Sequence, residues 1–185
     1  EAPDLALIFS KEPCTAAGLF TTNRVTAPPV RLTQKHIKSG KLQAIVANSG
    51  NANACTGPRG EAIAREMAEL TARQFGIAPD LVAVASTGVI GEPPPLEALR
   101  PGIPQAVKAL SPKGSRHAAR AIMTTDRRPK EAAARANVGG RTVTVGGIAK
   151  GSGMIHPNMA TMLAFITTDI SIEPALLRQM LSIAA

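Results

Sequence analysis

Short apolar runs bounded by turn-forming residues are the feature that most restricts how this chain can fold. Three of them cover residues 5–9, 42–47 and 81–85. Runs of this length fit buried β-strands better than helices, which need ten or more residues to bury one face. The second and third runs each end in a polar cluster that contains a glycine, so a turn is expected after each strand.

Further strands are expected from apolar or alternating patterns elsewhere in the chain. These patterns cover residues 17–21, 142–145 and 161–166, and Gly146-Gly147 is expected to end the second of the three strands. The third is predicted to be buried, because its side chains are almost all apolar.

Helical periodicity separates the predicted strands. A helix is expected from Pro58 to Gly76, since proline suits a first turn and glycine suits the position after the last turn. Apolar residues keep helical spacing over residues 96–110. Pro101 and Pro104 predict that this stretch is split into two helices, because proline removes a backbone donor.

Two more helices are expected towards the end of the sequence. Ser115 is predicted to cap one that reaches Ile122. Pro174 is predicted to open another with Leu177, Met180, Leu181 and Ala184 facing inward. Because strands and helices alternate, the predicted fold class is α/β or α+β.

Charge and composition narrow the functional classes. The chain carries 21 Lys+Arg against 13 Asp+Glu, a formal charge of +8. The basic residues are scattered and no aromatic platform lies among them, which argues against nucleic acid as partner. No apolar stretch is long enough to suggest a membrane span. Cys14 and Cys55 are too far apart for a disulfide framework or a metal motif, and two free thiols suit a reducing, cytoplasmic compartment.

Residues 146–168 contain the arrangement most suggestive of chemistry. Lys150 is expected to lie in a glycine-flanked turn, from which its side chain could reach a cleft. Further on, the small residue Ala160 precedes Thr161 at the start of an apolar run. A threonine hydroxyl is a weak nucleophile unless a base is adjacent, and cutting the preceding peptide bond would free its own α-amine for that purpose. From the residues alone, a structural threonine beginning a strand is the commoner alternative.

Four motifs in order along the whole chain resemble the ornithine acetyltransferase family of arginine biosynthesis. They are NSGNANACTG at 48–57, STGVIG at 86–91, AIMTTD at 121–126 and KGSGMIHPNMATML at 150–163. The resemblance implies an α+β layered sandwich of the N-terminal-nucleophile type. It also implies autocatalytic cleavage between Ala160 and Thr161. Residues 1–160 would then form an α-chain region, and 161–185 the start of a β-chain region.

The same resemblance assigns roles to individual residues. Thr161 would be the nucleophile that takes acetyl from N2-acetylornithine and passes it to glutamate in a ping-pong reaction. Thr87 and Gly88 would form the oxyanion hole, and Thr124 and Lys150 would bind substrate with Thr161. No metal or cofactor is implied, although a bifunctional variant would also use acetyl-CoA. Two α and two β chains would assemble as a heterotetramer.

Weaker alternatives remain for these residues and for the chain. Without the resemblance, Lys150 would be expected at the surface, Thr87 in an ordinary turn and Thr124 at the end of a helix. An N-terminal-nucleophile aminopeptidase, or a basic domain that binds nucleic acid or an acidic protein, are the other candidate functions. The family's β chain is also expected to continue beyond residue 185, and the family's first residues to precede residue 1.

Overall fold

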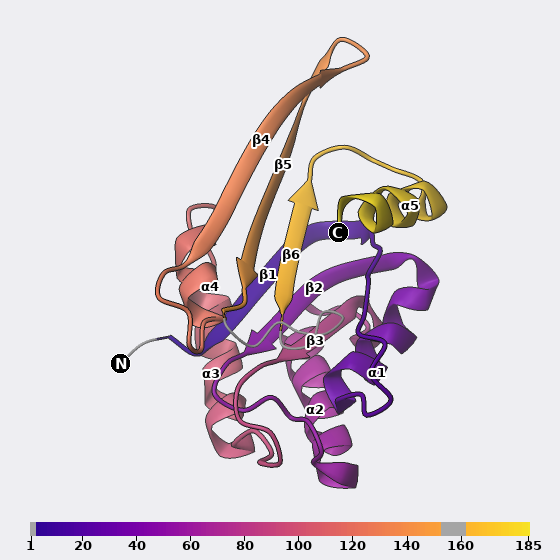
Figure 1. Ribbon diagram of the computed structural model, residues 1–185. Helices are drawn as coiled ribbons and strands as arrows, with labels where there is room; N and C mark the ends of the chain where they lie inside the picture. Colours follow the sequence, from indigo (N-terminus) through magenta and orange to yellow (C-terminus); the bar gives the residue numbers. More distant parts are fainter. Residues whose placement is uncertain (1–2, 153–161) are drawn as a thin grey trace.

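The described residues form two three-stranded sheets, with helices packed on the first (Figure 1). The computed structural model describes residues 3–152 and 162–185. The first sheet has the order β1-β2-β3, formed by Leu5–Thr15, Lys41–Asn48 and Val82–Ser86. β1 is antiparallel to β2, whereas β2 and β3 are parallel and end at the same edge. The predicted α/β class, an α+β layered fold, is confirmed.

Alternation along the strands divides the first sheet into two faces. Leu7, Val46 and Val84 pack on one side with residues of α2 (Gly57–Phe75) and α3 (Leu96–Lys108). The neighbouring small residues, such as Ala6 and Ala47, face the opposite way. There they meet Ala119, Ala121 and Ile122 near α4 (Ser115–Ala121), together with Ile148 of the second sheet. Period-two patterning therefore builds a three-layer arrangement around the first sheet.

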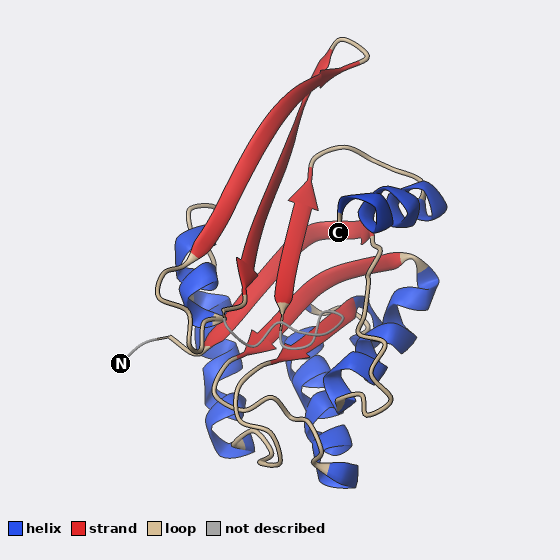
Figure 2. Cartoon of the chain, in the orientation of Figure 1, coloured by secondary structure: helices blue, strands red, loops and turns tan. Residues whose placement is uncertain are grey.

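The second sheet is antiparallel and has the order β4-β5-β6, formed by Lys130–Val138, Arg141–Lys150 and Leu163–Thr168. Its long β4–β5 hairpin projects away from the helix-covered sheet, as Figure 2 shows in red. Every residue of β4 is exposed, and α5 (Pro174–Ala184) has no buried residue. The remaining elements are α1 (Pro28–His36) and the short 3₁₀ helices Ile37–Ser39 and Pro79–Leu81. Within the described ranges, no helix has both the length and the apolar character needed to cross a bilayer.

Several predicted elements differ from the observed ones. Residues 17–21 are not a strand. α3 is continuous through Pro101 and Pro104, because burial of Leu99 and Ile103 outweighs the two backbone donors that proline removes. Ser115 is the first residue of α4 rather than its cap, and its hydroxyl donates to Glu131 Oε2 at 3.0 Å.

The prediction that a strand ends at Gly146-Gly147 is also wrong. Gly146 and Gly147 do not end the strand; they pair within β5, which continues to Lys150. A Cβ on Gly147 would lie 3.2 Å from the carbonyl oxygen of Phe165, so the ladder itself favours the small residue. β6 begins at Leu163 and is largely exposed rather than buried. On α5, Leu177 and Leu181 are half-buried, whereas Met180 and Ala184 are exposed.

Candidate functional site

The candidate site begins where β2 and β3 end side by side. The Thr87 N–H donates to the carbonyl of Asn48 at 3.0 Å, and the Ser86 hydroxyl donates to Asn48 Oδ1 at 2.6 Å. One step further, the Val89 N–H donates to the carbonyl of Gly50 at 2.9 Å. The two turns predicted after these strands therefore form one hydrogen-bonded unit, as expected at the shared edge of parallel strands.

Gly88 allows these two turns to approach so closely. Its φ is +133°, and a Cβ at this position would lie 2.2 Å from the carbonyl oxygen of Gly50. No side chain fits between these two backbones, so glycine is required. Among the residues that the structure describes, none accepts a hydrogen bond from the Gly88 N–H. This donor lies next to the Thr87 side chain in sequence, as the predicted oxyanion hole requires.

Lys150 connects two other predicted site residues, Thr87 and Thr124. Its ammonium donates to Thr87 Oγ1 at 3.0 Å and to Thr124 Oγ1 at 2.7 Å. Lys150 is the last residue of β5 and only 3% exposed, so the expectation of a turn lysine, or of a surface lysine, is wrong. Thr87 is equally buried, whereas Thr124 is exposed and lies beyond the end of α4. The cluster thus has one open side.

Hydrogen-bond chemistry defines what the two threonines can do. An ammonium group only donates, so both hydroxyl oxygens must act as acceptors towards Lys150. Each hydroxyl consequently keeps its own proton for a different acceptor. A buried threonine whose oxygen faces a cation and whose proton is free is suited to donate to a developing negative charge.

The charge of Lys150 is tuned by its surroundings. Burial lowers the pKa of the Lys150 ammonium, the Asp126 carboxylate raises it, and the Lys130 ammonium lowers it further; the net direction is downward. Its two direct partners, Thr87 and Thr124, are neutral. The cation is therefore held mainly by hydroxyl dipoles rather than by a contacting carboxylate.

Asp126 is a buried carboxylate beside this cluster. It forms an ion pair with Lys130, accepts the Gly151 N–H at 2.9 Å and is 3.4 Å from the Thr124 backbone nitrogen. Burial would raise the pKa of Asp126, but the hydrogen bonds from Lys130, Gly151 and Thr124 outweigh it and hold the pKa below its ordinary value. Asp126 belongs to the motif at residues 121–126, but no role was predicted for it from the sequence. Lys130 was not predicted as a site residue. The only sequence signal for Asp126 was its position directly after two threonines, Thr124 and Thr125.

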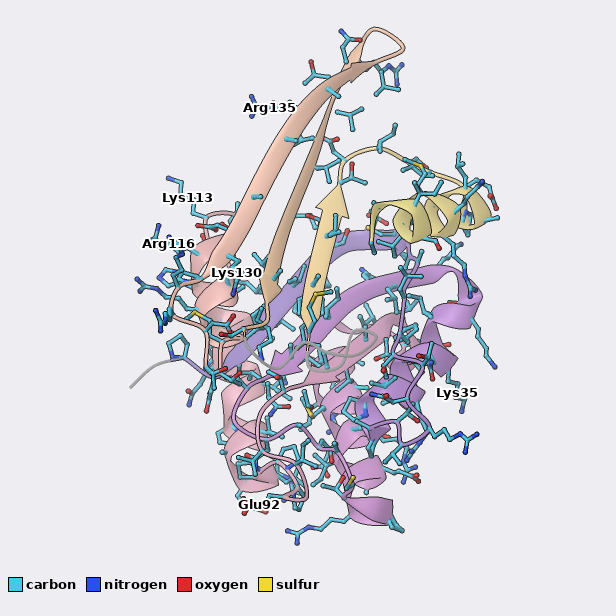
Figure 3. The ribbon with its side chains drawn as sticks, in the orientation of Figure 1. Lys35, Glu92, Lys113, Arg116, Lys130 and Arg135 are labelled. Atoms are coloured by element: carbon cyan, nitrogen blue, oxygen red, sulfur yellow. The ribbon has the colours of Figure 1, made fainter. Side chains whose placement is uncertain are left out.

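Figure 3 shows where Lys130 lies: at the root of the β4–β5 hairpin, beside α4. This is the place where the second sheet meets the first. The predicted nucleophile Thr161 and the predicted cleavage position Ala160–Thr161 lie outside the described residues. The chain is described again from Met162, and Leu163 pairs with Lys150 in the ladder between β5 and β6. Among the described residues, no group of three or more His, Cys, Asp or Glu side chains could hold a metal ion.

Comparison with known proteins gives a consistent set of relatives. A family model described as "ArgJ family" matches residues 1–185. The arginine biosynthesis bifunctional protein ArgJ of Symbiobacterium thermophilum is 60% identical over 178 residues, which are 96% of this chain and 44% of that protein. Its counterpart in Thermosynechococcus vestitus is 52% identical over 181 residues, 97% of this chain and 43% of that protein. The chain thus spans less than half the length of these curated relatives.

Solved structures of similar proteins share the fold. The crystal structure of ArgJ from Bacillus halodurans superposes with a TM-score of 0.79 at 47% identity, covering 85% of this chain and 83% of that one. The ornithine acetyltransferase of Mycobacterium tuberculosis, crystallised in complex with ornithine, gives a TM-score of 0.75 at 41% identity, covering 85% and 84%.

Proposed function

Because the chain belongs to the ArgJ family, we propose that it is part of an acetyltransferase of arginine biosynthesis. In this proposal the enzyme moves an acetyl group from N2-acetylornithine to glutamate through an acetyl-threonine intermediate. The observation that carries the proposal is the buried Lys150 ammonium, hydrogen-bonded to both Thr87 and Thr124.

The oxyanion role of Thr87 and Gly88 is supported by the donors they present. The Thr87 hydroxyl accepts from Lys150 and keeps its proton, and the Gly88 N–H has no acceptor among the described residues. Attack on an acetyl carbonyl places negative charge on its oxygen. Two fixed donors aimed at that oxygen stabilise the transition state more than the ground state, and losing one such donor typically lowers kcat by about 10²–10³-fold.

Lys150 and Thr124 are proposed to bind the substrate. Two of the three ammonium donors of Lys150 go to threonine hydroxyls, which leaves a third for a carboxylate or carbonyl oxygen of the substrate. N2-acetylornithine and glutamate each carry an α-carboxylate, so one cationic group can serve both halves of a ping-pong reaction. Thr124 lies on the exposed side of the cluster, where its hydroxyl proton is available to a ligand.

Thr161 is proposed to be the nucleophile after autocatalytic cleavage at Ala160–Thr161. Its hydroxyl would attack the Ala160 carbonyl, and the peptide C–N bond would break as the acyl group moves to oxygen. Breaking that C–N bond frees the α-amine of Thr161, which serves as general base. Hydrolysis of the resulting ester by water would then free the Thr161 hydroxyl and leave a carboxylate on Ala160. The pairing of Leu163 with Lys150 supports this role, because Leu163 follows Thr161 by only two residues.

The acetyl-transfer steps follow from that free N-terminus. The Thr161 hydroxyl attacks the acetyl carbonyl while its α-amine takes the proton. The C–N bond of N2-acetylornithine breaks, and ornithine leaves with a proton on its amine. The glutamate amine then attacks the acetyl ester and regenerates the threonine hydroxyl.

Other features of the proposal come from the name of the relatives and from the family resemblance of the motifs. The relatives are named bifunctional proteins, which supports acetyl-CoA as a second acetyl donor for glutamate. An assembly of two α and two β chains, cut between residues 160 and 161, and a cytoplasmic location complete the proposal.

The decisive experiment compares the full-length gene product with Thr161→Ala and Thr161→Ser by intact mass and acetyl-transfer assay. We expect wild type to give two fragments, the second beginning at Thr161, and Thr161→Ala to give one uncut, inactive chain. Thr161→Ser should still be cut. Thr167→Ala, which changes an exposed threonine of β6, is the matched control and should behave like wild type.

The same assays separate the competing functions. An aminopeptidase would hydrolyse peptides without transferring acetyl to glutamate. A basic binding domain would show salt-dependent affinity for nucleic acid and no dependence on Thr161. A single unprocessed wild-type chain with full acetyl-transfer activity would contradict the proposed nucleophile.

A further inference from the structure

The peptide groups of Gly151 are held from both sides by one ion pair. The Gly151 N–H donates to Asp126 Oδ1 at 2.9 Å, and the Gly151 carbonyl accepts from Lys130 Nζ at 2.9 Å. Asp126 and Lys130 also contact each other directly, which closes the arrangement. Gly151 immediately follows Lys150. The two hydrogen bonds of Gly151 therefore fix the backbone at the end of β5, where the Lys150 side chain enters the site.

The same carboxylate reaches the second substrate-binding residue. Asp126 Oδ2 accepts, at 3.4 Å, from the backbone N–H of Thr124, whose hydroxyl oxygen accepts from Lys150. One buried side chain therefore connects the segment after α4 to the end of β5. These segments are 25 residues apart in sequence, and the described hydrogen bonds of Asp126 go to Lys130 and to these two backbone amides.

A purely stabilising role does not account for this geometry. The Asp126 side chain is fully buried, whereas 48% of the Lys130 side chain is exposed, so the desolvation cost falls mainly on the carboxylate. Both members of the pair hydrogen-bond the backbone next to Thr124 and Lys150, which is where precise placement matters for the reaction.

We propose that Asp126 and Lys130 are positioning residues that hold Thr124 and Lys150 in register for substrate binding and acetyl transfer. The inference rests on the function proposed above. Neither residue needs to touch the substrate. Among the described residues, Asp126 and Lys130 are also the charged groups that act on Lys150, and they act in opposite directions.

Because Asp126 and Lys130 shift the pKa of Lys150 in opposite directions, their variants can be distinguished by a pH profile. A merely structural role would not produce opposite shifts. Asp126→Asn removes the charge that raises the pKa of Lys150, so the pH above which activity is lost should move down. Lys130→Gln removes a charge that lowers the pKa of Lys150, so the pH above which activity is lost should move up. Glutamine still presents a donor for the Gly151 carbonyl. The two variants should therefore shift the alkaline limb of kcat/KM in opposite directions.

The measurement is kcat/KM for N2-acetylornithine against pH in the full-length, processed enzyme. Near neutral pH we expect Asp126→Asn to lower kcat/KM by about 10²-fold, as a small misplacement of site groups does. Glu97→Gln and Lys113→Gln change exposed residues and serve as charge-matched controls that should leave the profile unchanged. Circular dichroism of each variant verifies that it is folded.

The possible outcomes separate this inference from the proposed function. If wild type transfers no acetyl group, both fail together. If wild type is active but both variants leave the alkaline limb in place, or shift it in the same direction, the positioning role is overturned and the proposed function stands. Should Asp126→Asn not fold, Lys130→Gln alone decides, and an unshifted or lowered limb overturns the inference.

Discussion

The two sheets of this molecule have similar sizes and opposite burial. In the first sheet, β2 has five of its eight residues buried and packs helices on one face and α4 on the other. In the second, none of the nine residues of β4 is buried, and β5 is buried only near its end, at Ile148 and Lys150. The first sheet is stabilised by side-chain burial, whereas the outer half of the second is held mainly by its backbone ladder.

The contrast explains where the candidate site lies. Lys150 belongs to the second sheet, but both of its hydrogen-bond partners lie at the edge of the layers built on the first. The site therefore occupies the junction, where the exposed sheet becomes buried. Burial at that junction removes Lys150 from water and makes each of its hydrogen bonds stronger than it would be at the surface.

The largest effect on kcat is expected at Gly88, in the turn that follows β3 of the first sheet. Gly88→Ala should lower kcat of the full-length enzyme by about 10²–10³-fold, because a Cβ would collide with the Gly50 carbonyl and displace the oxyanion donors. Gly91→Ala is the matched control: φ is +90°, but nothing lies within 4 Å of the added Cβ. It should cost about 1–3 kcal/mol of stability and leave kcat near wild type. Equal losses of kcat would contradict the close-approach argument.

The next effect tests whether Lys150, a residue of the second sheet, contributes to the site at the edge of the first. Lys150→Met keeps the length of the side chain and removes its donors, so kcat/KM should fall by about 10²-fold. Lys35→Met changes an exposed lysine on α1 and should have no effect. Steady-state kinetics with N2-acetylornithine measure both variants. Wild-type kinetics in Lys150→Met would show that the junction is not the site.

A valine pair compares the stability of the two sheets directly. Val46 in β2 is fully buried, whereas Val138 at the tip of β4 is 50% exposed. Val46→Ala should lower the free energy of unfolding by about 2–3 kcal/mol through lost burial and a residual cavity. Val138→Ala should change it by less than about 1 kcal/mol. Denaturant unfolding of both variants makes the comparison, and a large loss at Val138 would show that the hairpin is buried in the complete protein.

The smallest effect concerns acid stability at the junction. The pKa of Asp126 is lowered in the folded chain, so its contribution to stability is present above the unfolded value of about 3.9 and is lost as the pH falls through the folded value. Wild type should therefore lose more stability than Asp126→Asn between pH 5 and pH 2, as urea unfolding at several pH values would show. Asp80→Asn, at an exposed position, should follow wild type. An identical slope in Asp126→Asn would contradict the role of the pair.

The sequence patterns predicted the first sheet better than the rest. Its three strands and α2 were predicted because burial on a sheet leaves compact apolar runs and helical stripes. α1 was not predicted, since Pro28, Pro29 and Thr33 are its only buried residues and form no apolar stripe. β4 was missed for a related reason: all its residues are exposed, so pairing with β5, rather than burial, makes it a strand.

For the site, motif resemblance located Thr87, Gly88, Thr124 and Lys150, and the structure places the last two with Thr87 in one hydrogen-bonded cluster. The resemblance included Asp126 in a motif without assigning it a role, and it did not include Lys130. Their importance depends on contacts with Gly151, which is 25 and 21 residues away. The roles of Thr161 and of the cleavage between residues 160 and 161 remain predictions.

The sequence alone therefore determined the local features: apolar strands, the turns that follow them, and the family motifs in their order. Only the tertiary structure decided that Lys150 is buried and which hydroxyls hold it, because those contacts span 63 and 26 residues. Local patterns record which residues prefer a strand or a turn. The environment of a charge is set by whatever distant segments pack around it, and those segments leave no periodic signal in the chain.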